Sequence, residues 1–169
     1  SKLQADVAVR DLADNTFKVV VLRPPMIYGK ESKGNYPVLA KIAKKLPIFP
    51  DVNNERSMLY IDNLCEFLCQ IMLIKEHNRN AIVLLPQNAE WTETSEMVKE
   101  IASASGKKLI EMKILKPVVI MGSKIPGKIG GLVNKAFGNN CYMHKLSIYE
   151  GIQYQQINIK KSIYETEKI

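Results

Sequence analysis

The sequence has no long apolar run: the roughly 20 consecutive apolar residues that a helix needs to cross a bilayer do not occur in it. The first residues also lack the apolar core of a secretory signal. These two absences lead us to expect a cytoplasmic protein. The chain has 169 residues, of which 46% are hydrophobic, and this is enough for one compact core.

Cysteine and histidine are scarce, with three and two residues. Cys65 and Cys69 lie one helical turn apart, whereas Cys141 is far along the chain. We expect reduced thiols and no metal site, because no ligand spacing typical of zinc emerges. Pairing Cys65 and Cys69 with His77 or His144 is an alternative, but two small apolar residues on one buried helix face explain the cysteines more simply.

Acidic residues are almost absent between Lys107 and Lys135, where seven lysines face Glu111 alone. This segment carries +6 of the formal charge of +7. It has no interleaved aromatic residues, so anionic sugar diphosphates or a peripheral contact with anionic lipid are better partners than nucleic acid. A solvated face is the simple alternative. The apolar residues among these lysines predict a packed cap subdomain in preference to an amphipathic membrane-surface patch.

The most informative stretch that is present runs from Val19 to Gly29 and reads VVVLRPPMIYG. Its apolar residues without polar alternation predict a strand buried on both faces, as in a parallel sheet covered by helices. Pro24 and Pro25 then prevent ladder hydrogen bonds at the carboxyl end of the strand, where open α/β sheets bind their ligands. We therefore expect the functional site to begin here.

The rest of the chain alternates helix and strand patterns, which predicts an α/β fold. We expect helix starts capped by Asn35, Asp62 and Thr94, because these residues precede apolar runs with helical spacing. The expected helices and strands are a helix over 1–14, strands over 57–61, 81–85 and 108–113, and short helices over 117–122 and 129–137.

Three segments together resemble the extended short-chain dehydrogenases, the NAD-dependent sugar-nucleotide epimerase/dehydratase family. The segment 23–29 is similar to the family's RPxxVYG, and 56–64 (RSMLYIDNL) is similar to its R-x-x-x-x-V-D-D-L block. The first five residues resemble the tail of its YxxxK motif. The resemblance runs from Ser1 to about Ser105, and it implies that the catalytic tyrosine and the glycine-rich βαβ half lie before this chain.

The implied fold is the carboxyl-terminal part of a Rossmann-like parallel sheet plus a small substrate-binding subdomain. Residues 1–30 would end the NAD-binding core, and 31–169 would form most of the subdomain, with strands near 57–61 and 81–85 returning to the sheet. Lys2 would be the catalytic lysine, which contacts the nicotinamide ribose and lowers the pKa of the tyrosine. Pro24 and Pro25 would line the nicotinamide. Without the resemblance, Lys2 is a surface lysine.

The resemblance also implies a substrate site formed by Met26, Asn35, Pro47, Phe49 and Arg56. Arg56 would grip the substrate diphosphate with its planar guanidinium, and Phe49 would lie against the base. The simpler alternatives are a helix cap for Asn35, an edge strand for Phe49 and a solvated loop for Arg56. The family usually has an asparagine where Met26 stands, and methionine cannot replace its hydrogen bond. We therefore expect an N-acetylhexosamine or deoxysugar nucleotide, or a lipid-diphosphate sugar, before UDP-glucose.

The function that follows is the substrate-binding part of an NAD-dependent sugar-nucleotide epimerase. Alternatives are a dehydratase or 4-keto-sugar reductase of the same family, and a non-catalytic nucleotide-sugar or membrane-surface binding module. We expect NAD to act in the intact enzyme and not to bind this chain alone. The partner is a nucleotide-diphosphate sugar, and exposed apolar strands would make the chain dimerise or self-associate.

Overall fold

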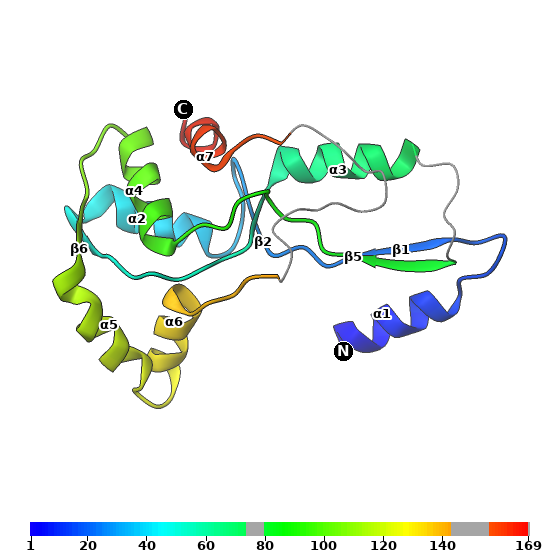
Figure 1. The fold of residues 1–169 in the computed structure, drawn as a ribbon, viewed down its shortest axis with the longest axis horizontal. Coiled ribbons are helices and arrows are strands. Elements are labelled where there is room, and N and C mark those ends of the chain that lie inside the picture. Colours follow the sequence, from blue (N-terminus) through cyan, green and yellow to red (C-terminus); the bar gives the residue numbers. More distant parts are fainter. Residues whose placement is uncertain (74–79, 143–155, 169) are drawn as a thin grey trace.

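The computed structural model describes residues 1–73, 80–142 and 156–168. It is elongated, with a small sheet between two helices at one end and a larger helical group at the other (Figure 1). All strand pairs among the described residues are parallel and belong to three two-stranded sheets. The α/β class predicted from the sequence is thus confirmed, with its parallel strands divided among small sheets.

The first sheet pairs β1 (Val19–Leu22) with β5 (Ala81–Leu84), and Val19 lies opposite Ala81. Helix α1 (Lys2–Asp11) lies on one side of this sheet and α3 (Ile61–Leu73) on the other (Figure 1). Helices on both faces are what the apolar β1 sequence predicts, but full burial of the strand was wrong, because only Val19 is buried and the other three residues of β1 are half-buried. Phe67 of α3 and Leu84 form the buried centre of this end, with flanking side chains from both strands.

The larger group is built around β2 (Met26–Tyr28), which pairs with β4 (Met58–Tyr60). Helices α2 (Tyr36–Lys45) and α4 (Thr94–Ala104) pack against each other, and α7 (Ile159–Glu167) packs on α4. The third sheet joins β3 (Ile48–Pro50) to β6 (Ile110–Met112). Tyr28 is at the centre of this core, stacked on Tyr36 with ring centroids 5.4 Å apart.

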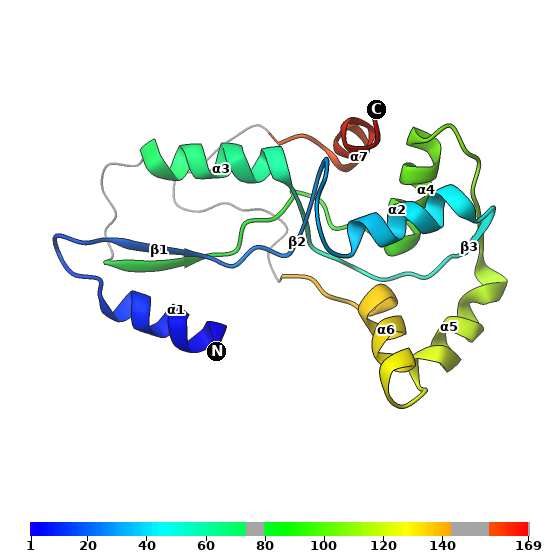
Figure 2. The ribbon, with the colours of Figure 1, turned by 180° about the vertical axis from the view of Figure 1, so that it is seen from behind.

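A helical hairpin projects from the edge of the larger group (Figures 1 and 2). It consists of the short 3-10 helix η1 (Lys113–Leu115), α5 (Lys116–Ser123) and α6 (Lys128–Phe137). Its tight turn depends on Gly130, where a Cβ atom would lie 1.9 Å from the carbonyl oxygen of Ile125. Two short helices were expected in this region, and the structure contains both.

The expected buried face of α3 and two of the expected helix caps are wrong. Helix α1 buries no residue, and Leu3 and Leu12 are both 65% exposed. Cys65 and Cys69 of α3 are exposed instead of buried. The inward face of α3 carries Asn63, whose amide donates to Asn88 and to the carbonyl oxygen of Ile157, and these bonds set the rotation of the helix.

The expected caps also differ from the structure. Helix α3 begins at Ile61, so Asp62 lies inside its first turn, and α4 begins at Thr94 with Glu93 as the cap residue. Asn35 does occupy the cap position of α2, but its side chain makes no capping hydrogen bond. His77 and His144 lie outside the described residues.

Candidate functional site

The candidate site is a cavity of about 230 Å³ in the larger group. It lies where α2, the β2–β4 pair, the beginning of α4 and the end of α6 meet. Most of its walls are apolar, and a few polar groups converge on it, which is the usual character of a small-molecule site. The lining residues are Met26, Asn35, Val38, Leu39, Ile42, Arg56, Met58, Thr92, Thr94, Met97, Leu132, Lys135 and Ala136.

Arg56 is the central polar residue of this cavity, and it is 9% exposed. Its Nη1 donates to the carbonyl oxygens of Lys135 at 2.9 Å, Ala136 at 3.4 Å and Gly138 at 3.2 Å. These are carbonyls at the carboxyl end of α6, where a cation also complements the helix dipole. The solvated loop that we considered as the alternative for Arg56 is therefore wrong.

The remaining donors of Arg56 are available to a ligand. Within the part of the chain that the structure describes, its Nε and Nη2 donate no hydrogen bond. Burial lowers the pKa of the Arg56 guanidinium, but such a group stays protonated in proteins. The cavity thus contains a held cation with unused N–H groups, which is suited to an oxyanion of a phosphate or carboxylate.

The position of Arg56 is fixed from both sides. Its backbone N–H donates to the Thr92 carbonyl oxygen at 3.0 Å, and the Thr92 N–H returns a bond of 3.1 Å. Beside it, the Asn54 side chain accepts from the Thr94 N–H at 2.9 Å and donates to the Thr94 hydroxyl at 3.0 Å. Thr94 in turn donates to the carbonyl oxygen of Ala136 at 2.7 Å. The end of α6 is therefore tied to α4 and to the Arg56 segment.

Three of the five expected substrate residues meet in this cavity: Met26, Asn35 and Arg56. Met26 is the first residue of β2 and pairs in register with Met58, which also lines the cavity. Asn35 precedes α2, and its amide is not used as a helix cap. These residues come from three separate segments, and parallel pairing of β2 with β4 brings two of the segments together.

The other two expected substrate residues are elsewhere. Pro47 precedes β3, and the ring of Phe49 is 4% exposed, with its centroid 5.6 Å from that of Phe137. Neither residue lines the cavity. The Phe49 ring is almost fully covered, so its contact with a base stays a prediction.

The expected cofactor residues lie towards the first sheet. Lys2 opens α1 with an exposed side chain, and Pro24 and Pro25 connect β1 to β2. Arg23 donates to Asp6 at 2.8 Å and so ties α1 to the end of β1, and this hydrogen bond lowers the pKa of the Asp6 carboxyl. The roles predicted for Lys2 and the two prolines stay predictions.

A dinucleotide normally needs a strand, a glycine-rich turn and a helix amino terminus in that order. No such sequence of elements occurs among the described residues, where the strand β1 is followed by prolines. That this chain does not bind NAD by itself stays a prediction. The described helices also include none that is long and apolar enough to cross a membrane, and the described residues contain no acidic, histidine or cysteine cluster able to hold a metal ion.

Sequence reasoning missed the cavity residues contributed by α4 and α6. Thr94, Leu132, Lys135 and Ala136 follow Arg56 by many residues and carry no motif. Only the apolar spacing of Val38, Leu39 and Ile42 was visible, and it predicted a buried helix face without indicating a cavity.

Comparison with known proteins places this fold in a recognisable class. No protein-family model matches the chain. The structure resembles UDP-N-acetylglucosamine 4-epimerase from Bacillus cereus with a TM-score of 0.60 and 14% identity, over 89% of this chain and 47% of that one. It also resembles a human epimerase family protein solved with NADPH (TM-score 0.62, 14% identity, 93% and 50% coverage). These likenesses define a Rossmann-like α/β epimerase fold.

A curated relative gives a more particular result. UDP-glucose 4-epimerase from Vibrio cholerae is 32% identical over 136 residues, which cover 78% of this chain and 39% of the relative. The chain is thus homologous to UDP-glucose 4-epimerase, with structural neighbours in the NAD-dependent epimerase/dehydratase family, as the sequence motifs indicated. It spans about two fifths of the length of the curated relatives that it matches, 39% and 42%.

Proposed function

We propose that this chain supplies the substrate-binding part of an NAD-dependent nucleotide-sugar epimerase. The observation that carries the proposal is the meeting of Met26, Asn35 and Arg56, three residues predicted to bind substrate, in one cavity. Homology to UDP-glucose 4-epimerase supports the same reading. A structural neighbour with a TM-score of 0.54 and 12% identity, MoeE5, was solved with UDP-glucuronic acid and NAD, over 96% of this chain and 50% of that one.

In this proposal the diphosphate of the substrate lies against Arg56. The Nε and Nη2 atoms of Arg56 would donate to phosphate oxygens. The exposed Lys135 at the cavity wall would add a second positive charge. The cavity volume of about 230 Å³ is small for a whole nucleotide sugar, so it would receive one part of the ligand and leave the rest outside. The complete protein would hold NAD, which accepts the hydride, and Lys2, Pro24 and Pro25 would contribute to that site.

The substrate that we propose is an N-acetylhexosamine or deoxysugar nucleotide, or a lipid-diphosphate sugar. The Vibrio cholerae relative is named for UDP-glucose. Our proposal differs because Met26 lines the cavity where an asparagine would offer a hydrogen bond. A higher kcat/KM of the complete protein for UDP-glucose than for UDP-N-acetylglucosamine would contradict this choice of substrate.

The test of the binding site itself is a calorimetric titration of the complete protein with UDP-N-acetylglucosamine. Lys135→Gln removes the cation at the cavity wall, and Lys128→Gln is its matched control, because Lys128 is exposed on the same helix but does not line the cavity. We expect Lys135→Gln to weaken binding severalfold at low salt and Lys128→Gln to leave it unchanged. Equal effects of the two variants would reject the cavity as the diphosphate site.

A further inference from the structure

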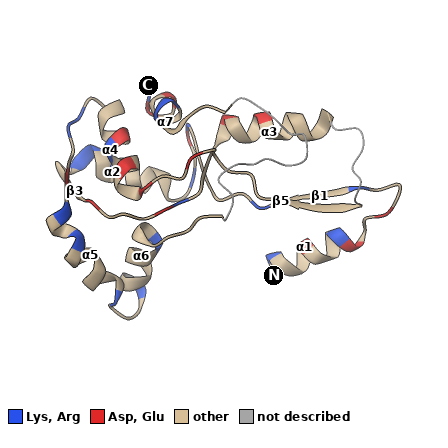
Figure 3. Cartoon of the chain, in the orientation of Figure 1, with Lys and Arg blue, Asp and Glu red and all other residues tan. Residues whose placement is uncertain are grey.

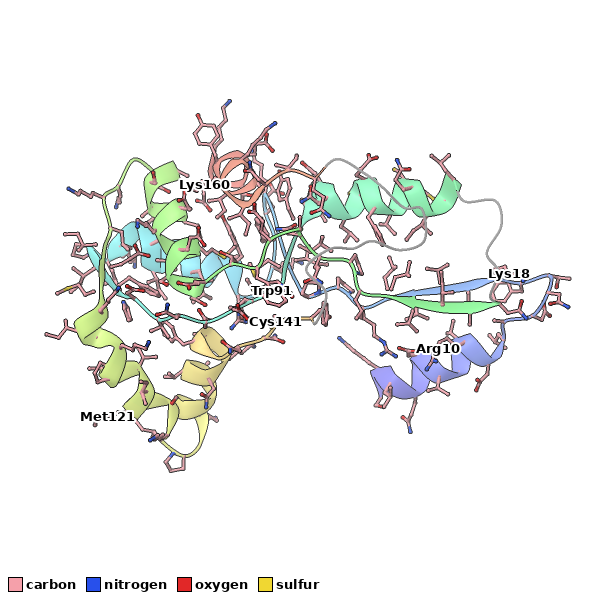
Figure 4. The ribbon with its side chains drawn as sticks, in the orientation of Figure 1. Arg10, Lys18, Trp91, Met121, Cys141 and Lys160 are labelled. Atoms are coloured by element: carbon pink, nitrogen blue, oxygen red, sulfur yellow. The ribbon has the colours of Figure 1, made fainter. Side chains whose placement is uncertain are left out.

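The helical hairpin has four apolar side chains that are exposed in the described part of the chain. Val118 and Met121 lie three residues apart on one side of α5, Ile114 precedes them in η1, and Ile125 follows in the turn after α5. They are 75%, 64%, 71% and 45% exposed. Helix α5 buries no residue at all. We call these four residues the α5 outer face, and Figure 4 shows Met121 pointing away from the body of the protein.

The packed cap subdomain that we favoured from the sequence therefore does not account for these residues. Helix α5 packs on α6 through a neighbouring part of its surface, where a Cβ atom at Gly122 would lie 3.4 Å from Val133. An isolated exposed apolar residue is ordinary, but four on one projecting face indicate an interaction surface.

The charge along the hairpin sequence is of one sign. Lys113, Lys116, Lys124 and Lys128 are exposed at the two ends of α5, and no acidic residue occurs between Lys113 and Lys135 (Figure 3). None of these lysines forms an ion pair with another described residue. A surface of apolar side chains bordered by lysines suits a lipid bilayer, whose anionic headgroups lie above an apolar interior.

We propose that the α5 outer face and its flanking lysines dock the protein on an anionic lipid surface. A second copy of the chain fits less well, because symmetric pairing of this face would bring the lysines of both copies together without any carboxylate between them. The hairpin also lies at an edge of the molecule in opposite views, where a flat surface can reach it (Figures 1 and 2). The apolar side chains would enter the headgroup region, and the lysines would contact lipid phosphates. This inference does not depend on the cavity or its ligand.

The test is co-sedimentation of the 169-residue chain with phosphatidylcholine vesicles that contain or lack about a third phosphatidylserine. We expect binding to the anionic vesicles only, and weaker binding at high salt. Lys124→Gln with Lys128→Gln should lower the partition coefficient by about fivefold per lysine. Lys30→Gln with Lys33→Gln, two exposed lysines near α2, is the matched control and should change it less than about twofold.

A second pair of variants tests the apolar contribution. Val118→Ser with Met121→Ser should reduce binding roughly tenfold. Met72→Ser with Leu73→Ser is its control, because these residues are 76% and 71% exposed at the far end of α3. Equal binding to neutral vesicles, or equal losses in the two pairs, would overturn the proposal. A third result would also overturn it: Val118→Ser with Met121→Ser lowers the mass of the protein in solution but leaves vesicle binding intact. In that case a second copy of the chain would cover the face.

Discussion

Replacement of Arg56 by alanine is the sharpest test of the candidate site. In the complete protein we expect Arg56→Ala to weaken binding of a nucleotide-diphosphate sugar by about 1.5–3 kcal/mol, the range for a charge-assisted hydrogen bond. This corresponds to a roughly 10- to 150-fold higher Kd. The affinity for NAD should change little, because Arg56 lies in the α2, α4 and α6 region and not beside β1.

The structure also predicts a loss of stability in the same variant. Nη1 of Arg56 donates to carbonyl oxygens of Lys135 and Gly138 at 2.9 and 3.2 Å, and alanine would leave these acceptors without that donor. Such a loss costs about 1–3 kcal/mol in the free energy of unfolding. Urea unfolding measures this cost, and calorimetry with UDP-N-acetylglucosamine and with NAD measures the two affinities.

Asn54→Ala is the control that separates the two effects. Asn54 ties the same region together through Thr94 and the carbonyl oxygen of Gly138, but it does not line the cavity. It should destabilise the protein without a matching loss of sugar-nucleotide affinity. If Asn54→Ala weakened the sugar nucleotide as much as Arg56→Ala, or if Arg56→Ala weakened NAD equally, Arg56 would be a structural residue only.

Three further predictions concern the chain itself. The 169-residue chain should not bind NAD at micromolar concentration and should scatter light as a species larger than 19.1 kDa; tight NAD binding by a monomer would contradict this. Tyr28→Phe should lower the free energy of unfolding by about 1–3 kcal/mol in urea titrations, because the Tyr28 hydroxyl is 2.6 Å from the Ser162 hydroxyl and accepts from Asn88. Burial raises the pKa of the Glu93 carboxyl, so the native state binds the Glu93 proton more tightly than the unfolded state does. Glu93 therefore destabilises the fold as the pH rises above the ordinary pKa of a glutamate. Glu93→Gln should therefore raise Tm at pH 7, with the gain shrinking towards pH 4.5, and a gain independent of pH would refute this cause.

Much of the fold followed from local patterns. The run of valines at β1 predicted a strand covered by helices, and the apolar spacing after Asn35 predicted α2. Both patterns depend on neighbours within a few residues, so they can be read from one sequence. The short parallel strand β6 was visible in the same way, from the alternation of charged and apolar residues around Ile110.

The direction in which helices face was harder to predict. Helix α3 has apolar residues on more than one side, so its spacing permitted several rotations. The observed rotation turns Asn63 inward. Its side-chain amide donates to Asn88 and to the carbonyl oxygen of Ile157, and its side-chain oxygen accepts from the Ile157 N–H. A buried polar group with distant partners overrides the apolar pattern, because leaving it unpaired costs more than exposing Leu68 or Met72.

The candidate site was predictable only where a motif resemblance marked it. Met26, Asn35 and Arg56 were identified in this way, whereas the cavity walls from α4 and α6 were not. The partners of Arg56 at Lys135, Ala136 and Gly138 are backbone carbonyls, and 79 to 82 residues separate them from Arg56. A backbone acceptor leaves no trace in residue type, so no pattern in the sequence could have indicated these contacts.

Helix α6 connects the two proposed roles of the protein and also keeps them separable. Its carboxyl end is held by Arg56 and Thr94, and its side chains at Leu132 and Lys135 form one wall of the cavity. The α5 outer face belongs to the other arm of the hairpin, and none of its four residues lines the cavity. Substitutions at Val118 and Met121 should therefore affect lipid binding alone, whereas changes at Arg56 act on the cavity and on the attachment of the whole hairpin.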